Sequence, residues 1–274
     1  MREFGFQQIV ERSLNKNYRG PLYSKFLEAI DQYHLIESGD KIAVALSGGK
    51  DSLLMAKLFQ EFQKHGSIQF ELFFMTMDPG FYQEDLDKHM KLCESVGVDV
   101  HVVKSNIFDV TNRIAKENPC YLCARMRRGS LYKIAKENGC NKLALGHHFD
   151  DVIETTLLNI FYAGQFKTML PKAKSENYEG IELIRPMYLI KEKDIERFRK
   201  YHHLESMSCG CRIARNELDS KRKEIKLLIE SLRKIYKNID INIFRAAENV
   251  NIQNVLGYYD DFGKYSFLDK YNKE

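Results

Sequence analysis

The string SGGKDS, residues 47–52, holds the residue types best suited to chemistry in this chain. A short apolar run, Ile42–Leu46, precedes it and predicts a buried parallel strand, and an apolar helical pattern follows it from Leu53. Glycines allow a close approach of the backbone to an anion, and amide N–H groups and the helix dipole favour negative charge there. The string contains neither the Walker A loop nor the dinucleotide fingerprint, so it predicts an anion-binding loop of another kind.

Four cysteines have the spacing of a metal or redox site. Cys120 and Cys123 lie three residues apart at the start of a predicted helix, so their thiols face the same way, and a helix N-terminus stabilises thiolates. Cys209 and Cys211 lie farther along the chain. The pattern fits a structural zinc bound by all four, a redox pair formed by the first two, or an iron–sulfur cluster bound by three with one iron left open.

Alternating strand and helix patterns must position these residues. We expect strands at residues 41–46, 68–77, 99–104, 142–146 and 181–184, with helices between them that begin near residues 53, 84 and 124. This alternation predicts an α/β fold with a doubly wound, mostly parallel sheet, in which ligands bind beyond the carboxyl ends of the strands. The loops at residues 47–52, 77–78 and 146–148 should therefore meet at one edge of the sheet.

The chain divides by pattern into three regions. Residues 1–39 form an N-terminal helical extension, residues 40–190 the α/β domain, and residues 191–274 a C-terminal helical region with a loose tail after Tyr258. His147 and His148, which follow the fourth strand, are interpreted as residues that fix loop geometry. His202 and His203 are expected to form a solvated surface pair rather than a contact near Cys209 or RNA. Phe161 and Tyr162 are expected to lie in the core because they continue an apolar pattern.

Composition limits the classes of protein. The chain has 274 residues, of which 44% are hydrophobic, and no apolar run reaches the roughly 18 residues of a membrane span. The first residues lack the apolar region of a signal peptide, so we expect a soluble, cytoplasmic protein with no membrane partner. Cys93 and Cys140 stand alone and are interpreted as packing residues. Basic residues concentrate at 125–142 and 212–237, which either form a surface for a polyanion or are two solvated helix faces.

The wider strings point to a family. SGGKDS resembles the signature of the PP-loop ATP pyrophosphatases. Over about residues 36–257 the chain is similar to one of their branches, the tRNA 2-thiocytidine synthetase family. The strings that carry this resemblance are CYLCARMRRG at 120–129, LGHHFDD at 145–151, ET at 154–155, NIFYAG at 159–164, IRPM at 184–187 and EKDIERF at 192–198.

The resemblance implies a fold of the PP-loop, adenine nucleotide alpha hydrolase type, with ATP and Mg²⁺ at the SGGKDS loop. The residues implied in ATP binding are Ala45, Ser47, Gly48, Gly49, Asp51, Ser52, Met77 and Gly146. Asp151 would be the catalytic carboxylate near the α-phosphate, with Asp51 and the basic Arg127 as further catalytic residues. A [4Fe-4S] cluster would be bound by Cys120, Cys123 and Cys209, with Cys211 as the alternative third ligand.

The implied reaction transfers AMP to the C2 oxygen of the cytidine at position 32 of a tRNA anticodon loop and then replaces that oxygen with sulfur. Adenylation turns the oxygen into a good leaving group, and the phosphate charge requires Mg²⁺ and preorganised N–H donors. Three cysteine ligands leave one iron free to carry hydrosulfide. The implied partners are tRNA, ATP and a sulfur donor, either sulfide or a persulfide carrier, and the resemblance is compatible with a homodimer.

Two alternatives stay open. The same fold and cluster could act on another substrate, a uridine or a small molecule. The thiouridine-forming paralogue carries terminal zinc-binding cysteines, but this chain has none before Cys93 or after Cys211, which favours the cytidine branch. The second alternative is an RNA-binding module stapled by zinc, with a vestigial nucleotide loop. The intact Asp51, Ser52 and Asp151 argue against it.

Overall fold

The computed structural model describes residues 4–105, 107, 119–205 and 217–271, with side chains omitted at 119–124, 217–220 and 270. Two compact units make up the chain. The first consists of Met1–Val152 and Met169–Arg222, and the second of Ile153–Thr168 and Lys223–Glu274.

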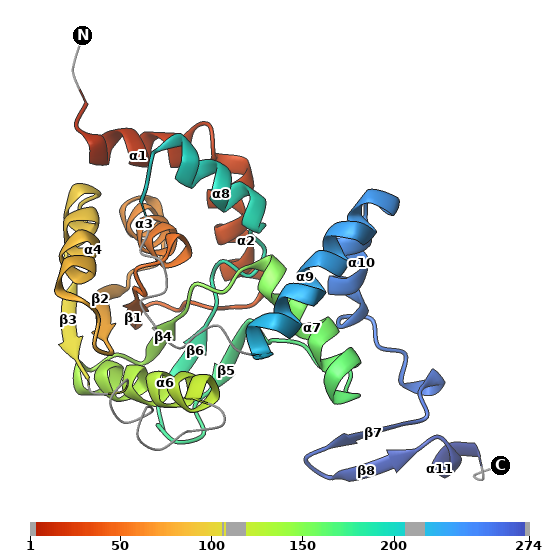
Figure 1. Ribbon diagram of the computed structural model, residues 1–274. Helices are drawn as coiled ribbons and strands as arrows, with labels where there is room; N and C mark the ends of the chain where they lie inside the picture. The colour runs from red at the N-terminus through yellow and green to blue at the C-terminus, as the bar shows by residue number, and fades with distance from the viewer. Residues whose placement is uncertain (1–3, 106, 108–118, 206–216, 272–274) are drawn as a thin grey trace. The chain divides into compact units, whose positions relative to one another are not determined.

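A six-stranded sheet forms the centre of the first unit (Figure 1). The strand order is β3-β2-β1-β4-β6-β5, and all neighbours are parallel except β5 and β6. The predicted doubly wound, mostly parallel sheet is therefore confirmed. The strands are β1 (Lys41–Ala45), β2 (Glu71–Asp78), β3 (His101–Lys104), β4 (Lys142–Ala144), β5 (Lys172–Lys174) and β6 (Glu182–Ile184).

Helices cover both faces of this sheet. Helices α3 (Lys50–His65) and α4 (Gln83–Ser95) connect β1 to β2 and β2 to β3, and α6 (Pro119–Glu137) leads back to β4. Parallel crossovers are right-handed, so reversing direction along the sheet puts α6 on the face opposite α3, as Figure 1 shows. The central residues of β1, Ile42–Val44, are fully buried between these layers. The chain adds β2 and β3 on one side of β1, and β4 and β6 on the other. The strand order therefore reverses between β1 and β4, which is where ligands bind in such folds.

Helices from both ends of the first unit pack on α3. They are α1 (Phe6–Asn15), the π-helical turn Arg19–Ser24, α2 (Lys25–Gln32) and α8 (Glu192–Tyr201). The buried Lys57 of α3 donates to Glu11 of α1 at 2.9 Å. His202, just after α8, is 4% exposed and hydrogen-bonds Ser13 at 2.5 Å. The expectation that His202 and His203 are a solvated pair was wrong for His202, because α1 covers it, and is confirmed for His203, which is exposed.

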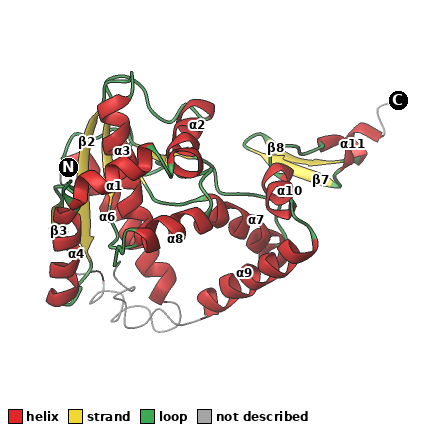
Figure 2. Cartoon of the chain, turned by 90° about the horizontal axis from the view of Figure 1, so that it is seen from above, coloured by secondary structure: helices red, strands yellow, loops and turns green. Residues whose placement is uncertain are grey.

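The second unit contains most of two long helices, two shorter helices and a hairpin. It takes the later part of α7 (Phe149–Ala163), most of α9 (Glu217–Ile235), α10 (Ile239–Ala246), the short turn Ile252–Asn254, β7 (Gly257–Asp260), β8 (Gly263–Ser266) and α11 (Leu268–Tyr271). Figure 2 shows the two antiparallel strands β7 and β8 followed by α11. The tail after Tyr258 is therefore not loose, since Asp260 accepts turn hydrogen bonds from the amides of Phe262 and Gly263.

Two aromatic side chains at the end of α7 are exposed to solvent. Phe161 and Tyr162, expected in the core, are 57% and 45% exposed. They lie at the end of α7, where the apolar pattern continues past the buried part of the helix.

Within the described parts of the chain, no helix combines the length and apolar character that crossing a bilayer requires.

Candidate active site

The loop between β1 and α3 has the geometry of an anion site. Gly48 has a φ of +84°, in the left-handed region where glycine is favoured. Gly49 precedes α3, and no side-chain hydrogen bond caps this end of the helix. Since the first N–H groups of a helix lack intrahelical partners, those of α3 are available to an anion.

Ser52 holds the loop from within. Its hydroxyl is buried, accepts from the backbone N–H of Ser47 at 3.1 Å and donates to the carbonyl of Gly49 at 2.9 Å. The hydroxyl oxygen of Ser47 lies 3.2 Å from the hydroxyl oxygen of Ser52. The predicted phosphate-binding Ser52 thus also fixes the shape of the loop whose amides would bind the phosphates.

Two neighbouring strands bring further predicted residues to this loop. Gly146 follows β4, and a Cβ built there would lie 3.3 Å from the backbone nitrogen of Ser52 and 3.4 Å from the carbonyl carbon of Asp51. The chain after β4 therefore passes directly against the first turn of α3. Met77, near the end of β2, is buried in the same cluster against which Ala45 packs. The structure thus brings these residues of β1, β2 and β4 together at the carboxyl ends of their strands.

One histidine joins the two predicted catalytic carboxylates. Nε2 of His148 lies 3.9 Å from Oδ1 of Asp51, and its Nδ1 lies 3.5 Å from Oδ2 of Asp151. The backbone N–H of His148 also donates to Asp151 at 3.0 Å. Phe149–Ala163 begins directly after this residue, so Asp151 sits in the first turn of α7. Asp51 and Asp151 therefore both lie against His148, in the first turns of two different helices.

The two carboxylates differ in their acidity. Burial raises the pKa of Asp51, although His148 and Lys50 lower it in part. Burial acts the same way on Asp151, but His148 and the hydrogen bond from its backbone outweigh it, so the pKa of Asp151 is lowered. Oδ1 of Asp51 is buried with no hydrogen-bond partner in the described structure. This oxygen lies 3.2 Å from Nζ of Lys50, and a carboxylate oxygen that accepts no hydrogen bond is suited to bind a metal cation as well.

The donor set suits Mg²⁺ better than a metal bound by protein alone. Among the residues that the structure describes, no three histidine, cysteine, aspartate or glutamate side chains gather in a metal-binding group. Mg²⁺ commonly binds through one or two carboxylates and completes its shell with water and phosphate oxygens. The pair Asp51 and Asp151 beside a phosphate loop fits that pattern.

Helix α8 supports the loop from one side. Nζ of Lys50 lies 3.2 Å from Asp51 and 3.6 Å from both Glu192 and Glu196. The carboxylate of Asp150 accepts from the backbone N–H of Glu192 at 2.7 Å and so anchors the start of α8. The sequence did not reveal that Lys50 pairs with α8, because the two segments are far apart in the chain.

The cysteines and Arg127 belong to α6 and the segment before α9. The backbone of α6 is helical from Pro119, so Cys120 and Cys123 lie in its first turns. Their side chains, and all of Cys209 and Cys211, lie outside the described residues. Arg127 is half-buried one turn farther along α6.

The remaining cysteines have the role expected of them. Cys93 and Cys140 are buried and free, and burial raises the pKa of the Cys93 thiol to about 12. A thiol with such a pKa stays protonated at neutral pH and is a poor nucleophile or ligand. Their interpretation as packing residues is confirmed.

The sequence did not single out Arg185 as a site residue, and it did not reveal which charged groups surround His147. Arg185 follows β6 and is 8% exposed. Burial and the charge of Arg185 lower the pKa of His147 to about 4, so this imidazole is neutral at pH 7. The string IRPM had marked Arg185 only as part of the resemblance. Its burial beside β4 depends on strand order, which the string alone does not reveal.

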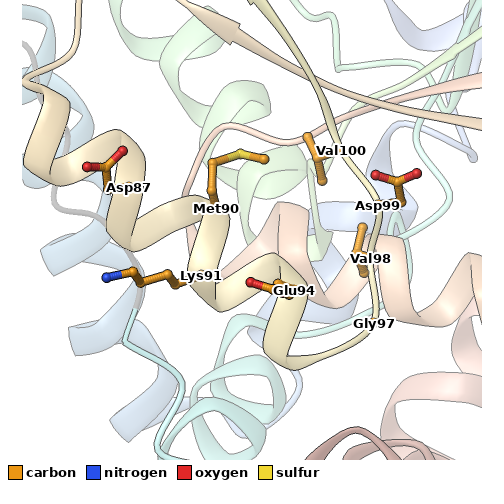
Figure 3. Close-up of a pocket in the computed structure, with 8 residues that line it drawn as sticks. All are labelled: Asp87, Met90, Lys91, Glu94, Gly97, Val98, Asp99 and Val100. Atoms are coloured by element: carbon orange, nitrogen blue, oxygen red, sulfur yellow. The ribbon is translucent and has the colours of Figure 1, made fainter.

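A groove of about 650 Å³ lies elsewhere on the first unit (Figure 3). It is lined by the later part of α4, including Asp87 and Glu94, and by the turn Gly97–Val100 that leads into β3. This turn enters the amino end of β3, whereas the loops described above leave the carboxyl ends of the strands. The groove is therefore separate from the candidate active site.

Known proteins share this arrangement of motifs. A family model for the PP-loop domain matches residues 21–208. The chain is 35% identical over 253 residues to the tRNA-cytidine(32) 2-sulfurtransferase of Hahella chejuensis. This alignment covers 90% of this chain and 85% of the relative. The chain belongs to this family of PP-loop proteins. The protein of the same name from Neisseria meningitidis is 36% identical over 249 residues, covering 89% of this chain and 75% of the relative.

A solved structure agrees with this assignment. The U34-tRNA thiolase NcsA from Methanococcus maripaludis, with its [4Fe-4S] cluster, superposes with a TM-score of 0.67 at 25% identity. The match covers 82% of this chain and 76% of the thiolase. The family predicted from the sequence is confirmed, and with it the class of an ATP-dependent sulfurtransferase.

Proposed function

We propose that this protein adenylates the C2 oxygen of a cytidine in a tRNA anticodon loop, at position 32, and replaces that oxygen with sulfur. The observation that carries the proposal is the uncapped start of α3 in the SGGKDS loop, beside two carboxylates joined by His148. This geometry occurs in a chain that belongs to the tRNA-cytidine(32) 2-sulfurtransferase family. An anion site next to an acidic pair suits transfer of a nucleotidyl group.

The loop would hold the polyphosphate of ATP. Backbone amides at Gly48, Gly49 and the first turn of α3 would bind the pyrophosphate that leaves, with the helix dipole stabilising its charge. The adenosine would lie beside Ala45 and Met77, at the ends of β1 and β2. ATP would then present its α-phosphorus toward the end of β4, where Gly146 leaves room for a close approach.

The two carboxylates would hold the cation that balances the negative charge at the α-phosphate. Asp151 is held ionised by His148, whereas Oδ1 of the half-buried Asp51 accepts no hydrogen bond in the described structure and lies 3.2 Å from Nζ of Lys50. Together they would hold Mg²⁺, which supplies electrostatic stabilisation of the phosphates when it is bound. Arg127, on α6, would add positive charge next to the reacting groups, as the family resemblance implies. The cytidine oxygen would attack the α-phosphorus, and pyrophosphate would leave.

The cysteines would serve the second half of the reaction. Cys120, Cys123 and Cys209 are the proposed ligands of a [4Fe-4S] cluster, with Cys211 as the alternative third ligand. Their support is the sequence spacing, the helical start of α6 and the cluster in the similar U34-tRNA thiolase. Such a cluster with one open iron would supply a site for sulfide, provided directly or by a persulfide carrier together with a two-electron reductant. The sulfur would attack C2 of the adenylated cytidine. The original C2 oxygen would leave with AMP.

The test is tRNA thiolation by anaerobically purified protein, comparing wild type with Asp151→Asn. We expect pyrophosphate release and thiocytidine formation to fall by about 100-fold or more, because a preorganised charge at the transition state is lost. Asp31→Asn is the matched control, since Asp31 is exposed on α2. Wild-type activity should be retained in this control.

Iron and zinc analysis of the anaerobically purified wild type and of two cysteine variants distinguishes the alternative functions. Four irons per chain, lost in Cys209→Ala but kept in Cys211→Ala, would support the three-cysteine cluster. One zinc per chain without iron would overturn the mechanism and favour the RNA-binding module. Pyrophosphate release without thiocytidine would indicate another acceptor.

A further inference from the structure

We propose that Arg185 and Arg128 form a second anion site, on the acceptor side of the active site, for a backbone phosphate of the RNA substrate. The inference rests on the proposed function only in taking RNA as the acceptor. It concerns residues that the adenylation chemistry above does not use.

Strand order brings this site next to the catalytic loops. β4 and β6 are parallel neighbours, with Ala144 opposite Ile184, and the N–H of Leu145 donates to the carbonyl of Ile184 at 3.0 Å. His147 and Arg185 therefore leave the same end of adjacent strands. Both are positioned beyond the carboxyl edge of the sheet, where ligands bind in this kind of fold.

Arg185 is held in place before any ligand binds. Its side chain is 8% exposed, its Nη1 donates to the carbonyl of Leu170, and its backbone N–H donates to the carbonyl of Pro171 at 2.9 Å. Nε is buried and has no hydrogen-bond partner in the described structure. One edge of the guanidinium is thus anchored, while the edge that carries Nε lacks an acceptor. Such a buried, orphaned donor is costly unless a ligand completes it.

The surrounding charge favours an anion. Burial and the nearby charge of Arg128 lower the pKa of Arg185 to about 10, and Asp151 is the carboxylate that acts in the opposite direction. Arg185, Arg222 and Arg128 also disfavour the protonated form of His147. Arg128, Arg185 and Arg222 all lie near His147, and Asp151 is the carboxylate that acts on both His147 and Arg185, so positive charge is in excess around these two residues. A phosphate would neutralise that excess and accept two parallel N–H bonds from a guanidinium.

The location separates this site from the pyrophosphate loop. Along the sheet the order is β2, β1, β4, β6, so Met77 lies toward one end and Arg185 toward the other. β6 is two strands from β1, which corresponds to about 10 Å at the usual strand spacing. ATP would occupy the β2 and β1 side, so the anion at β6 belongs to the acceptor. An RNA acceptor carries a phosphate beside every nucleoside.

The experiment measures binding of an unmodified tRNA transcript to the full-length protein over a series of salt concentrations. Arg128→Gln and Arg185→Gln should each weaken binding about tenfold or more, because a charge-assisted contact is lost. The slope of log affinity against log salt should fall by about 0.7 for each lost contact with unpaired RNA. The affinity for ATP, measured in parallel, should not change. Lys133→Gln is the matched control, since Lys133 is exposed on the same helix and pairs with Glu137.

Arg128 is exposed and anchors no described backbone group, so Arg128→Gln tests the site even if Arg185→Gln unfolds the protein. Wild-type tRNA affinity and salt slope in Arg128→Gln would overturn the proposal. Loss of ATP affinity with intact tRNA binding would also overturn it, because the anion would then be the nucleotide's own phosphate. Arginine-dependent tRNA binding without thiocytidine formation would refute the proposed function and leave the phosphate site standing.

Discussion

Replacing Gly146 with alanine tests how closely β4 and α3 approach each other. The new Cβ would lie 3.3 Å from the nitrogen of Ser52, 3.4 Å from its Cα and 3.4 Å from the carbonyl carbon of Asp51. All three are backbone atoms, so no side chain can rotate away, and the first turn of α3 must shift by a few tenths of an ångström. Overpacking of this kind costs about 1–3 kcal/mol. The displaced turn carries the amides proposed to bind pyrophosphate.

We expect Gly146→Ala to weaken binding of a non-hydrolysable ATP analogue by roughly tenfold, since about 1.4 kcal/mol corresponds to that factor. The melting temperature should fall by about 2–4 °C for each kcal/mol lost. Calorimetric titration and thermal unfolding measure the two effects. Gly129→Ala is the control, because a Cβ at this helical position meets no atom within 4 Å. Unchanged nucleotide affinity in Gly146→Ala would refute the proposed role of this contact.

Three further outcomes follow from the packing around α3. Ser52→Ala should lower the free energy of unfolding by about 1 kcal/mol in urea and weaken ATP binding, because the N–H of the exposed Ser47 loses its acceptor within the loop; full stability would contradict this. Glu11→Gln should lower the free energy of unfolding by about 3 kcal/mol, because the buried Lys57 keeps its hydrogen bonds to Gln60 and Val96 but loses the carboxylate that balances its charge. Adding Lys57→Met should recover part of that loss; without recovery, the unbalanced charge is not the cause. Burial raises the pKa of Glu11, but hydrogen bonds from Gln7, Lys57 and Lys64 lower it to about 2, below the ordinary 4.5. The folded state therefore binds fewer protons, so this stability is present above about pH 4.5 and is lost toward pH 2. Glu11→Gln should remove that part of the acid dependence, and an unchanged acid profile would show that other carboxylates cause it.

Local patterns in the sequence determined the loop and the elements around it. SGGKDS lies between an alternating apolar run and a helical pattern, and the structure has β1, the left-handed Gly48 and α3 in that order. The doubly wound sheet and the helical start of α6 were predicted for the same reason. Neighbouring residues encode these features, because propensity, turn chemistry and periodicity act over a few positions.

Only the tertiary structure decided what lies beside what. β5 was not predicted, since its three residues Lys172–Lys174 carry no strand pattern and become a strand by pairing with β6. His202 is buried because a helix from the other end of the unit covers it, and Lys57 is buried because Glu11 neutralises it. Arg185 lies near His147 because β4 and β6 are neighbours in the sheet. Such contacts join residues far apart in the chain, and no local pattern specifies which distant segment arrives.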